Sequence, residues 1–472
     1  MPQLFAIRLP SAPAARVRLA FVLALAVLVV GMSVKYAAKA SKPGDDGRQT
    51  RSAFLRWRAM IHEAFAGTNV YVGVHEYPNP PVMAVVLKPF ADLPPLAGAL
   101  AWFYAKVLMA ALACVWVFRL GLRDSGTQGL RDSGTAQPPS PPVSQSPSSP
   151  VPQSPSPSVP QSLSDWAKGL AVLLSLQPLL GDLSHNNVNI FILFLVAACL
   201  ELYRRGRDTG AGLVLGLAIA CKVTPLLFVA YFGWKRSWRV LAAAAAGLVL
   251  WLALVPGAVF GFERNAELLT DWYKLMVRPA LVENRVTSEH PNQSIPGVVY
   301  RLLTQSPSFL DYPDNIPTPA AFHNFTDIGT ANARRLVQGC LVAFGLVVVG
   351  LCRAPRGERG GPYFAAECAL IVLGMLLFSE RTWKHHAVTL VLPFAVLTTW
   401  LFAADTGKGA RRALAIVLAA VALLTTVPGA LSEDAADLAM VYGTHTAAFL
   451  LLTGAVTARL VTLRPRPAPT TG

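Results

Sequence analysis

Residues 238–260 read WRVLAAAAAGLVLWLALVPGAVF, and Arg239 is the one charged side chain in this run. About 20 apolar residues in a helix cross the roughly 30 Å hydrocarbon layer of a bilayer. Since lipid forces backbone hydrogen bonds to close internally, and the sequence lacks the short alternating segments of a barrel, it predicts an all-α, polytopic bundle of about 11 to 13 membrane segments. The plainest runs are 19–38, 95–118, 188–203, 238–260, 335–352, 363–379, 387–403, 412–430 and 441–462.

Composition indicates a membrane solvent. The 472 residues are 53% hydrophobic and 14% charged, which excludes an ordinary water-soluble domain. Lys and Arg number 41 against 26 Asp and Glu, but they stand in short clusters beside apolar runs, so we expect no nucleic-acid partner. Six cysteines lack paired spacing, so we expect neither a disulfide framework nor a metal site. The basic clusters expected in the cytoplasm are 204–207, 235–239, 353–359, 408–412 and 464–466.

Two long hydrophilic stretches, 39–79 and 261–334, fall outside the cytoplasm in this orientation. Each contains a segment whose apolar residues recur at helical spacing, at 52–66 and 265–282. Such segments are typical of helices that lie in the plane of the membrane interface. The two loops are therefore expected to build a composite extracytoplasmic site.

Three apolar pieces are shorter than a span, at 80–93, 168–181 and 211–233. If the N terminus and the cluster 204–207 are both cytoplasmic, the number of crossings between them is even, so one short piece up to residue 181 must re-enter without crossing. We assign this to 80–93 because Pro89 interrupts it. Residues 211–233 form two legs of about ten residues, which at about 1.5 Å per residue are too short to span. We expect this hairpin to be buried in protein or to line a cavity, with its turn facing outward.

The domain organisation follows from one change in composition. Gly-Leu-Arg-Asp-Ser-Gly-Thr occurs at 121–127 and again at 129–135, followed by Pro/Ser octads, and such a tract cannot bury a core. The first apolar run lacks a small-residue cleavage site, so we expect an uncleaved anchor. The predicted units are first membrane segments 1–120, a disordered linker 121–164 and a main bundle 165–472.

Five motifs in a fixed order resemble those of a known family. They are Gly67-Thr68-Asn69-Val70-Tyr71, Tyr77-Pro78-Asn79-Pro80-Pro81, Asn187-Val188-Asn189, the stretch from Ala211-Gly212 to Lys222-Val223-Thr224-Pro225, and Ser379-Glu380-Arg381-Thr382-Trp383-Lys384-His385-His386. In order and spacing they resemble glycosyltransferase family 87, which groups membrane mannosyltransferases of the GT-C superfamily. The resemblance covers much of the chain on both sides of the linker.

The resemblance implies a polyprenyl-phosphate sugar donor, commonly of mannose, with its phosphate at the outer face and its tail in the bilayer. It implies no cofactor, since neither a nucleotide sugar nor a metal is needed. The implied partners are this donor, a lipid or glycan acceptor, and membrane lipids. The implied location is the bacterial plasma (inner) membrane, with the active site facing the periplasm or exterior.

Candidate site residues also follow from chemistry. A leaving phosphate needs cations or hydrogen-bond donors, and ionisable groups inside a membrane mark functional sites. The candidates for donor phosphate binding are His385, His386, Lys384, Arg381 and Lys222. The candidates for the substrate cavity are Tyr77, Asn187, Asn189 and Asn292.

Most of these residues have a structural alternative. Lys222 can snorkel to the interface, and Arg381 and Lys384 can anchor to lipid headgroups. Asn187 and Asn189 can hydrogen-bond to neighbouring helices. Neither residue of the histidine pair is a natural end of a span, which favours phosphate contact for at least one of them.

The catalytic base departs from the family pattern. An acceptor hydroxyl needs a carboxylate to take its proton. The family places an Asp eighteen residues before the Tyr that is Tyr71 here, and this chain has Ala53 at that position. The candidate catalytic residues are the other carboxylates of this loop: Asp46, which we prefer, Asp45 and Glu76. The alternative is that these carboxylates are solvated and that the chain has lost catalysis or uses other groups.

The sequence thus predicts a membrane glycosyltransferase that moves a hexosyl group, mannosyl by resemblance, from a polyprenyl-phosphate sugar to an extracytoplasmic lipid or glycan acceptor. Two other classes stay open. A lipid-linked sugar flippase or transporter would also be polytopic with a cationic cavity. A non-catalytic protein of envelope assembly would explain the missing Asp.

Overall fold

The computed structural model describes residues 13–40, 52–73, 77–121, 164–283, 285–311, 313, 316–355 and 357–463. The predicted linker, apart from its two end residues, lies outside these ranges. The elements before residue 250 are α1 Pro13–Ala40, α2 Ala53–Ala66, α3 Pro81–Ala91, α4 Pro95–Leu120, α5 Asp165–His185, α6 Asn189–Arg204, α7 Asp208–Cys221, η1 Thr224–Leu226, α8 Leu227–Trp234 and α9 Trp238–Val249. The later elements are η2 Leu250–Leu254, α10 Val255–Phe260, α11 Phe262–Trp272, η3 Tyr273–Val277, α12 Arg278–Leu281, α13 Ile295–Leu303, β1 Phe309–Asp311, β2 Thr318–Ala321, α14 Thr330–Leu351, α15 Pro362–Leu377, η5 Lys384–Leu390, α16 Val391–Phe402, α17 Lys408–Leu431, α18 Glu433–Val441 and α19 Thr444–Leu463.

Many of these helices have the composition of membrane spans. In the described ranges seven are long and apolar enough to cross a membrane: Ala15–Ala38, Pro95–Leu120, Trp238–Phe260, Thr330–Leu351, Lys384–Phe402, Lys408–Leu431 and Thr444–Leu463. Val27 on α1 and Leu346 on α14 are 73% and 67% exposed, as expected of a surface that meets lipid. The predicted polytopic helical bundle is confirmed at this level, while the number of segments stays a prediction.

The centre of the bundle is made by helices without a polar face. In α15 every residue from Tyr363 to Leu377 is buried, and α6 buries most of its length in the same way. A helix that is apolar on all sides is stable only where protein or lipid surrounds it completely. The two helices α6 and α15, of 16 residues each, therefore belong to the core of the bundle.

The predicted hairpin at 211–233 is held by a close helix crossing. A Cβ on Gly212 would lie 2.3 Å from the carbonyl oxygen of Val240, and one on Gly216 would lie 2.8 Å from that of Ala244. Small residues four apart allow two backbones to approach in this way. The glycines therefore seat α7 on α9, and the first leg has 14 residues rather than the ten expected.

The stretch 238–260 is one continuous helical run with a π-helical turn at Leu250–Leu254. Pro256 follows this turn, and proline has no N–H to donate to the carbonyl of Leu252. Asn265 of α11 replaces the missing donor, since its Nδ2 donates to Leu252 O at 2.9 Å. This bond fixes the corner between α10 and α11.

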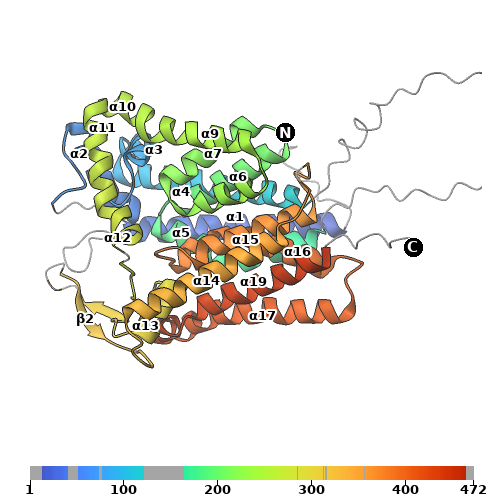
Figure 1. Cartoon of the computed structure of the whole chain (residues 1–472). Coiled ribbons are helices and arrows are strands. Elements are labelled where there is room, and N and C mark those ends of the chain that lie inside the picture. Colours follow the sequence, from blue (N-terminus) through green and yellow to red (C-terminus); the bar gives the residue numbers. More distant parts are fainter. Residues whose placement is uncertain are drawn as a thin grey trace, which may run out of the picture.

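The two long hydrophilic stretches meet at one end of the bundle, where Figure 1 shows α2, α10, α11 and α12 together. Arg264 donates to the carbonyl oxygens of Ala64 at 3.2 Å and Thr68 at 3.1 Å. Asn69 Nδ2 donates to Asp271 Oδ2 at 2.9 Å. Both predicted interfacial segments are helical, but α13, α18 and the antiparallel pair β1–β2 were not predicted.

Several basic clusters gather at the opposite end. Arg359 forms an ion pair with Asp208 and also donates to Tyr203 O at 3.2 Å. Lys235 contacts Glu367 at 2.7 Å and donates to Ala354 O at 3.0 Å. These contacts join the clusters at 204–207, 235–239 and 353–359, which were expected on one side of the membrane. Which side that is stays a prediction.

Candidate functional site

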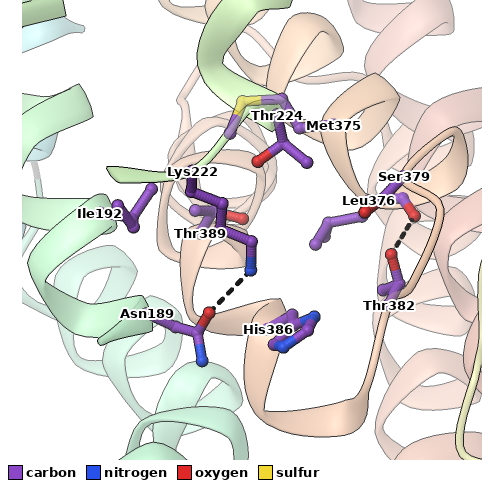
Figure 2. A pocket seen from close by; sticks show the side chains of 10 residues that line it. All are labelled: Asn189, Ile192, Lys222, Thr224, Met375, Leu376, Ser379, Thr382, His386 and Thr389. Atoms are coloured by element: carbon purple, nitrogen blue, oxygen red, sulfur yellow. Dashed lines mark hydrogen bonds between the residues drawn. The ribbon is translucent and has the colours of Figure 1, made fainter. Parts of the chain in front are cut away.

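A small cavity, here called the polar cavity, opens where the chain breaks between α7 and α8 (Figure 2). Much of its lining carries an amide, ammonium, hydroxyl or imidazole group, in a bundle that is otherwise mainly apolar. Convergent polar groups in a concavity are typical of a ligand site. The lining residues are Asn189, Ile192, Lys222, Thr224, Met375, Leu376, Ser379, Thr382, His386 and Thr389.

Lys222 reaches this cavity because the helix ends directly before it. α7 ends at Cys221, and Lys222 has the extended backbone angles φ −156° and ψ 129°. Pro225 lies in the next turn, and because proline has no N–H it cannot donate to the carbonyl of Cys221 and continue α7. The Lys-x-x-Pro motif thus turns the lysine side chain out of the helix, where its Nζ donates to Asn189 Oδ1 at 2.8 Å (Figure 2).

Asn189 is itself held by a buried ion pair. Its Nδ2 donates to Asp182 Oδ1 at 2.9 Å, and Lys106 Nζ lies 3.1 Å from Asp182 Oδ2. Asp182 and Lys106 are fully buried, on α5 and α4. A continuous polar chain therefore runs from Lys106 through Asp182 and Asn189 to Lys222.

His386 lines the polar cavity, whereas its neighbour does not. Trp383 N lies 3.2 Å from His386 Nδ1, and Arg381 O lies 3.1 Å from the same nitrogen. A single nitrogen accepts from the first or donates to the second. Accepting from Trp383 N puts the proton of the neutral ring on Nε2. In this tautomer His386 can donate to an anion in the cavity through Nε2.

His385 faces another set of residues. Its Nε2 lies 3.5 Å from Asn187 Nδ2, and its ring centre lies 5.0 Å from that of His185. Asn187 Oδ1 also accepts from Val188 N at 2.7 Å, which anchors the start of α6. The pair therefore divides into one histidine in the cavity wall and one packed behind it.

Thr389 adds an unused hydrogen-bonding group to the wall. Its side chain is 5% exposed, and its Oγ1 has no hydrogen-bond partner among the described residues. Buried hydroxyl groups in folded proteins are nearly always hydrogen-bonded. Thr389 and Lys222 both line the polar cavity (Figure 2), so one oxygen-rich ligand in it can reach both.

Asn292 supports the wall from outside. Its Nδ2 donates to Glu380 O at 2.8 Å, and its Oδ1 accepts from Thr382 N at 2.9 Å. Ser294 caps α13 by accepting from Gly297 N at 3.2 Å. The Asn-Gln-Ser tripeptide thus positions the loop that contains Thr382, and Asn292 is not among the lining residues of the polar cavity.

Three other expected site residues are not among the lining residues of the polar cavity. Arg381 donates to Thr287 Oγ1 at 3.0 Å, and Lys384 is exposed. Tyr77 is fully buried, with its ring 6.4 Å from that of Trp57, and burial raises the pKa of its hydroxyl. Their assignment to the donor phosphate and the substrate cavity stays a prediction.

The candidate bases Asp45, Asp46 and Glu76 lie outside the described residues. Ala53, at the position where the family pattern has Asp, is 2% exposed at the start of α2. The preceding Ser52 is linked through Tyr36 to Asn186, at 2.7 and 2.9 Å. The beginning of α2 is therefore tied to the turn between α5 and α6, next to the polar chain that ends at Lys222.

Two residues of this site were missed. Lys106 is the single lysine within the run 95–118, and Asp182 directly follows the short apolar piece at 168–181. An isolated charge in an apolar run is the signal that points to a functional or paired residue. The spacing of the two gives no sign that they meet, because 76 positions separate them.

The comparisons with known proteins agree with the motifs. Two curated relatives carry the name polyprenol-phosphate-mannose-dependent alpha-(1-2)-phosphatidylinositol mannoside mannosyltransferase. The one from Mycolicibacterium smegmatis is 28% identical over 232 residues, covering 48% of this chain and 44% of the relative. The one from Mycobacterium tuberculosis is 26% identical over 214 residues, covering 45% and 42%. The chain thus matches less than half of the length of each relative.

A sequence profile covers a larger share of the chain. The profile of glycosyltransferase family 87 matches residues 77–380, which include seven of the ten lining residues of the polar cavity, while Thr382, His386 and Thr389 follow directly after the matched range. This range is more than half of the 472 residues. The chain belongs to glycosyltransferase family 87.

Proposed function

We propose that this protein transfers a mannosyl group from a polyprenyl-phosphate sugar to a lipid or glycan acceptor at the extracytoplasmic face of a bacterial plasma membrane. The proposal extends to this chain the donor that the names of its two relatives give. The observation that carries it is the polar cavity, in which Lys222, His386 and the hydroxyl of Thr389 converge on one space.

These three groups suit the phosphate of the donor. A phosphate ester carries negative charge and several acceptor oxygens, while Lys222, His386 and Thr389 offer one cation and two further donors. As the reaction proceeds, charge grows on the leaving phosphate, and fixed donors then stabilise it most. The polyprenyl tail would leave the cavity into the surrounding lipid.

The reaction needs few other parts. The acceptor hydroxyl oxygen attacks the anomeric carbon of the sugar, and the bond between that carbon and the phosphate oxygen breaks. Polyprenyl phosphate departs with the electron pair, and the hydroxyl proton passes to a carboxylate. Asp46 is the proposed base, with Asp45 and Glu76 as alternatives. All three belong to the first hydrophilic stretch. Its described part lies at the end of the bundle where the two hydrophilic stretches meet, here called the loop end.

The orientation of the chain is part of the proposal. Basic clusters mark cytoplasmic ends, and those that the structure describes lie opposite α2, α11 and α12. We infer that the loop end faces the periplasm or exterior, in a GT-C type bundle of about 11 to 13 membrane segments. The six cysteines can be replaced by Ser to prepare a labelling test. Ile316→Cys should react with a membrane-impermeant maleimide in intact cells, and Arg412→Cys should react only after lysis.

Reconstitution tests the activity itself. Purified protein in lipid vesicles is given polyprenyl-phosphomannose and candidate acceptors, and released polyprenyl phosphate is measured. Acceptor-dependent release supports a transferase. Movement of the donor across the bilayer without release would instead identify a flippase. The absence of both release and movement would favour an assembly protein. Asp46→Asn should abolish turnover with normal expression, whereas full activity of that variant would move the base to Glu76 or elsewhere.

A further inference from the structure

The carboxylate of Asp182 holds the start of α6. Its Oδ1 accepts from Asn189 N at 3.3 Å and from Asn189 Nδ2 at 2.9 Å, and its Oδ2 accepts from Ile190 N at 3.4 Å. These are the first backbone N–H groups of α6, which have no partner within the helix. A negative charge at this end also interacts favourably with the helix dipole. Asp182 thus fixes the place of Asn189.

The amide of Asn189 has one workable orientation. Its Nδ2 faces the carboxylate of Asp182, and its Oδ1 accepts from Lys222 Nζ at 2.8 Å. The flipped amide would turn two donors toward an ammonium group and a carbonyl toward a carboxylate. The position of Lys222 in the cavity therefore depends on Asp182 through Asn189.

Lys106 determines the charge of this polar chain. Its Nζ contacts Asp182 Oδ2 at 3.1 Å and Asp182 O at 3.0 Å, and Lys106 does not line the cavity. Of the three charged groups that the bonds connect, Lys106 and Lys222 are positive and Asp182 is negative. Their sum is one positive charge. Without Lys106 the sum would be zero, and a phosphate would enter a neutral site.

We propose that Asp182 and Lys106 are positioning residues for the bound phosphate, a role that rests on the proposed function of the polar cavity. Asp182 orients Asn189 and thereby places Lys222. Lys106 engages the carboxylate, so that the positive charge of Lys222 stays available for an anionic ligand. A buried carboxylate that loses its partner would instead attract the nearest cation.

Equilibrium binding of polyprenyl phosphate to the full-length protein in lipid nanodiscs tests this role. Lys106→Met is expected to raise the dissociation constant about tenfold. Lys106→Met combined with Asp182→Asn restores the single positive charge and keeps an acceptor for Asn189, so the dissociation constant should return to within about threefold of the original. Lys235→Met is the matched control, because it breaks another buried pair, with Glu367, at the far end of α15. It should leave binding unchanged.

Two results would overturn the role. Unchanged binding by Lys106→Met excludes an influence of Lys106, and a double variant as weak as the single one excludes the charge balance. If Lys106→Met does not fold, Asp182→Leu is measured instead, because it removes the acceptor for Asn189. Unchanged binding by Asp182→Leu also overturns the role. Binding without sugar transfer by the unmodified protein would reject the proposed function and leave the binding comparison intact.

Discussion

Lys222 and Lys235 stand after the two legs of one hairpin, α7 and α8, yet their surroundings differ. Lys235 is 7% exposed and contacts Glu367 Oε2 at 2.7 Å, Ala354 O at 3.0 Å and Cys352 O at 3.3 Å. Lys222 is partly exposed to the polar cavity, and within the described ranges its one hydrogen-bond acceptor is the neutral amide of Asn189.

The difference separates a cation whose hydrogen-bond donors are satisfied within the fold from one that has donors left for the ligand we propose. Three acceptors, one of them charged, satisfy the ammonium group of Lys235. Lys222 retains unused donor capacity and an uncompensated charge, both of which a phosphate can use. Substitutions at the two positions should therefore affect different quantities.

The largest expected effect is on folding. Lys235→Met leaves Glu367 buried and unpaired, and should lower the free energy of unfolding by about 3–5 kcal/mol. Denaturant unfolding in detergent micelles measures this loss. Lys235→Met with Glu367→Leu should recover much of it, because no buried charge remains. A loss below about 1 kcal/mol for the single variant would mean that the pair does not hold the fold.

Lys222→Met should change function more than folding. A hydrogen bond to a charged group contributes about 1.5–3 kcal/mol, so kcat/KM for the donor should fall about 10- to 100-fold. Initial rates at several donor concentrations, with unfolding measured in parallel, give both quantities. If Lys222→Met unfolds as easily as Lys235→Met but transfers sugar at the normal rate, Lys222 serves folding rather than function.

The histidine pair sharpens the comparison within the cavity wall. His386 lines the cavity and His385 packs against Asn187, so His386→Ala should raise the donor concentration for half-maximal rate about tenfold. His385→Ala should raise it by a smaller factor, through a loosened wall. Equal donor saturation curves for His386→Ala and the unmodified protein would remove His386 from the phosphate site.

His290, in the second hydrophilic stretch, gives the smallest effect and a defined sign. Burial lowers its pKa, while Asp437, 3.4 Å away, partly opposes this. The folded state then binds its proton more weakly than the unfolded state, whose pKa is about 6.5. The contribution of His290 to stability is present above that pH and is lost as the pH falls below it. Thermal unfolding at pH 7 and pH 5 measures the change, and His290→Gln should reduce it. A melting temperature that rises on acidification through His290 would contradict the sign.

Hydropathy and motif order predicted much of this molecule. Long apolar runs require helices because lipid offers no hydrogen-bond partners, so the bundle follows from composition. Lys222, Asn189 and His386, which line the polar cavity, were among the candidates because their motifs resemble those of the family. The structure also explains the glycine in the motif that begins at Ala211-Gly212, because α9 leaves no room for a side chain at Gly212.

The rest depends on tertiary contacts. Lys106 and Asp182 form their ion pair only when α4 packs beside α5 and α6, and no local sequence pattern predicts that contact. Asn292 stays a prediction for the substrate cavity, and its bonds to Glu380 and Thr382 are visible only once the loops are folded. The pair β1–β2 has strands of three and four residues, too short to give a periodic signal.

A structure of the protein with polyprenyl-phosphomannose bound tests the central claim most directly. The phosphate is expected within hydrogen-bonding distance of Lys222 Nζ and His386 Nε2, with the sugar toward the loop end that contains α2 and α11. A phosphate bound at the opposite end, among the arginines at 204–207 or 353–359, would contradict both the site and the orientation.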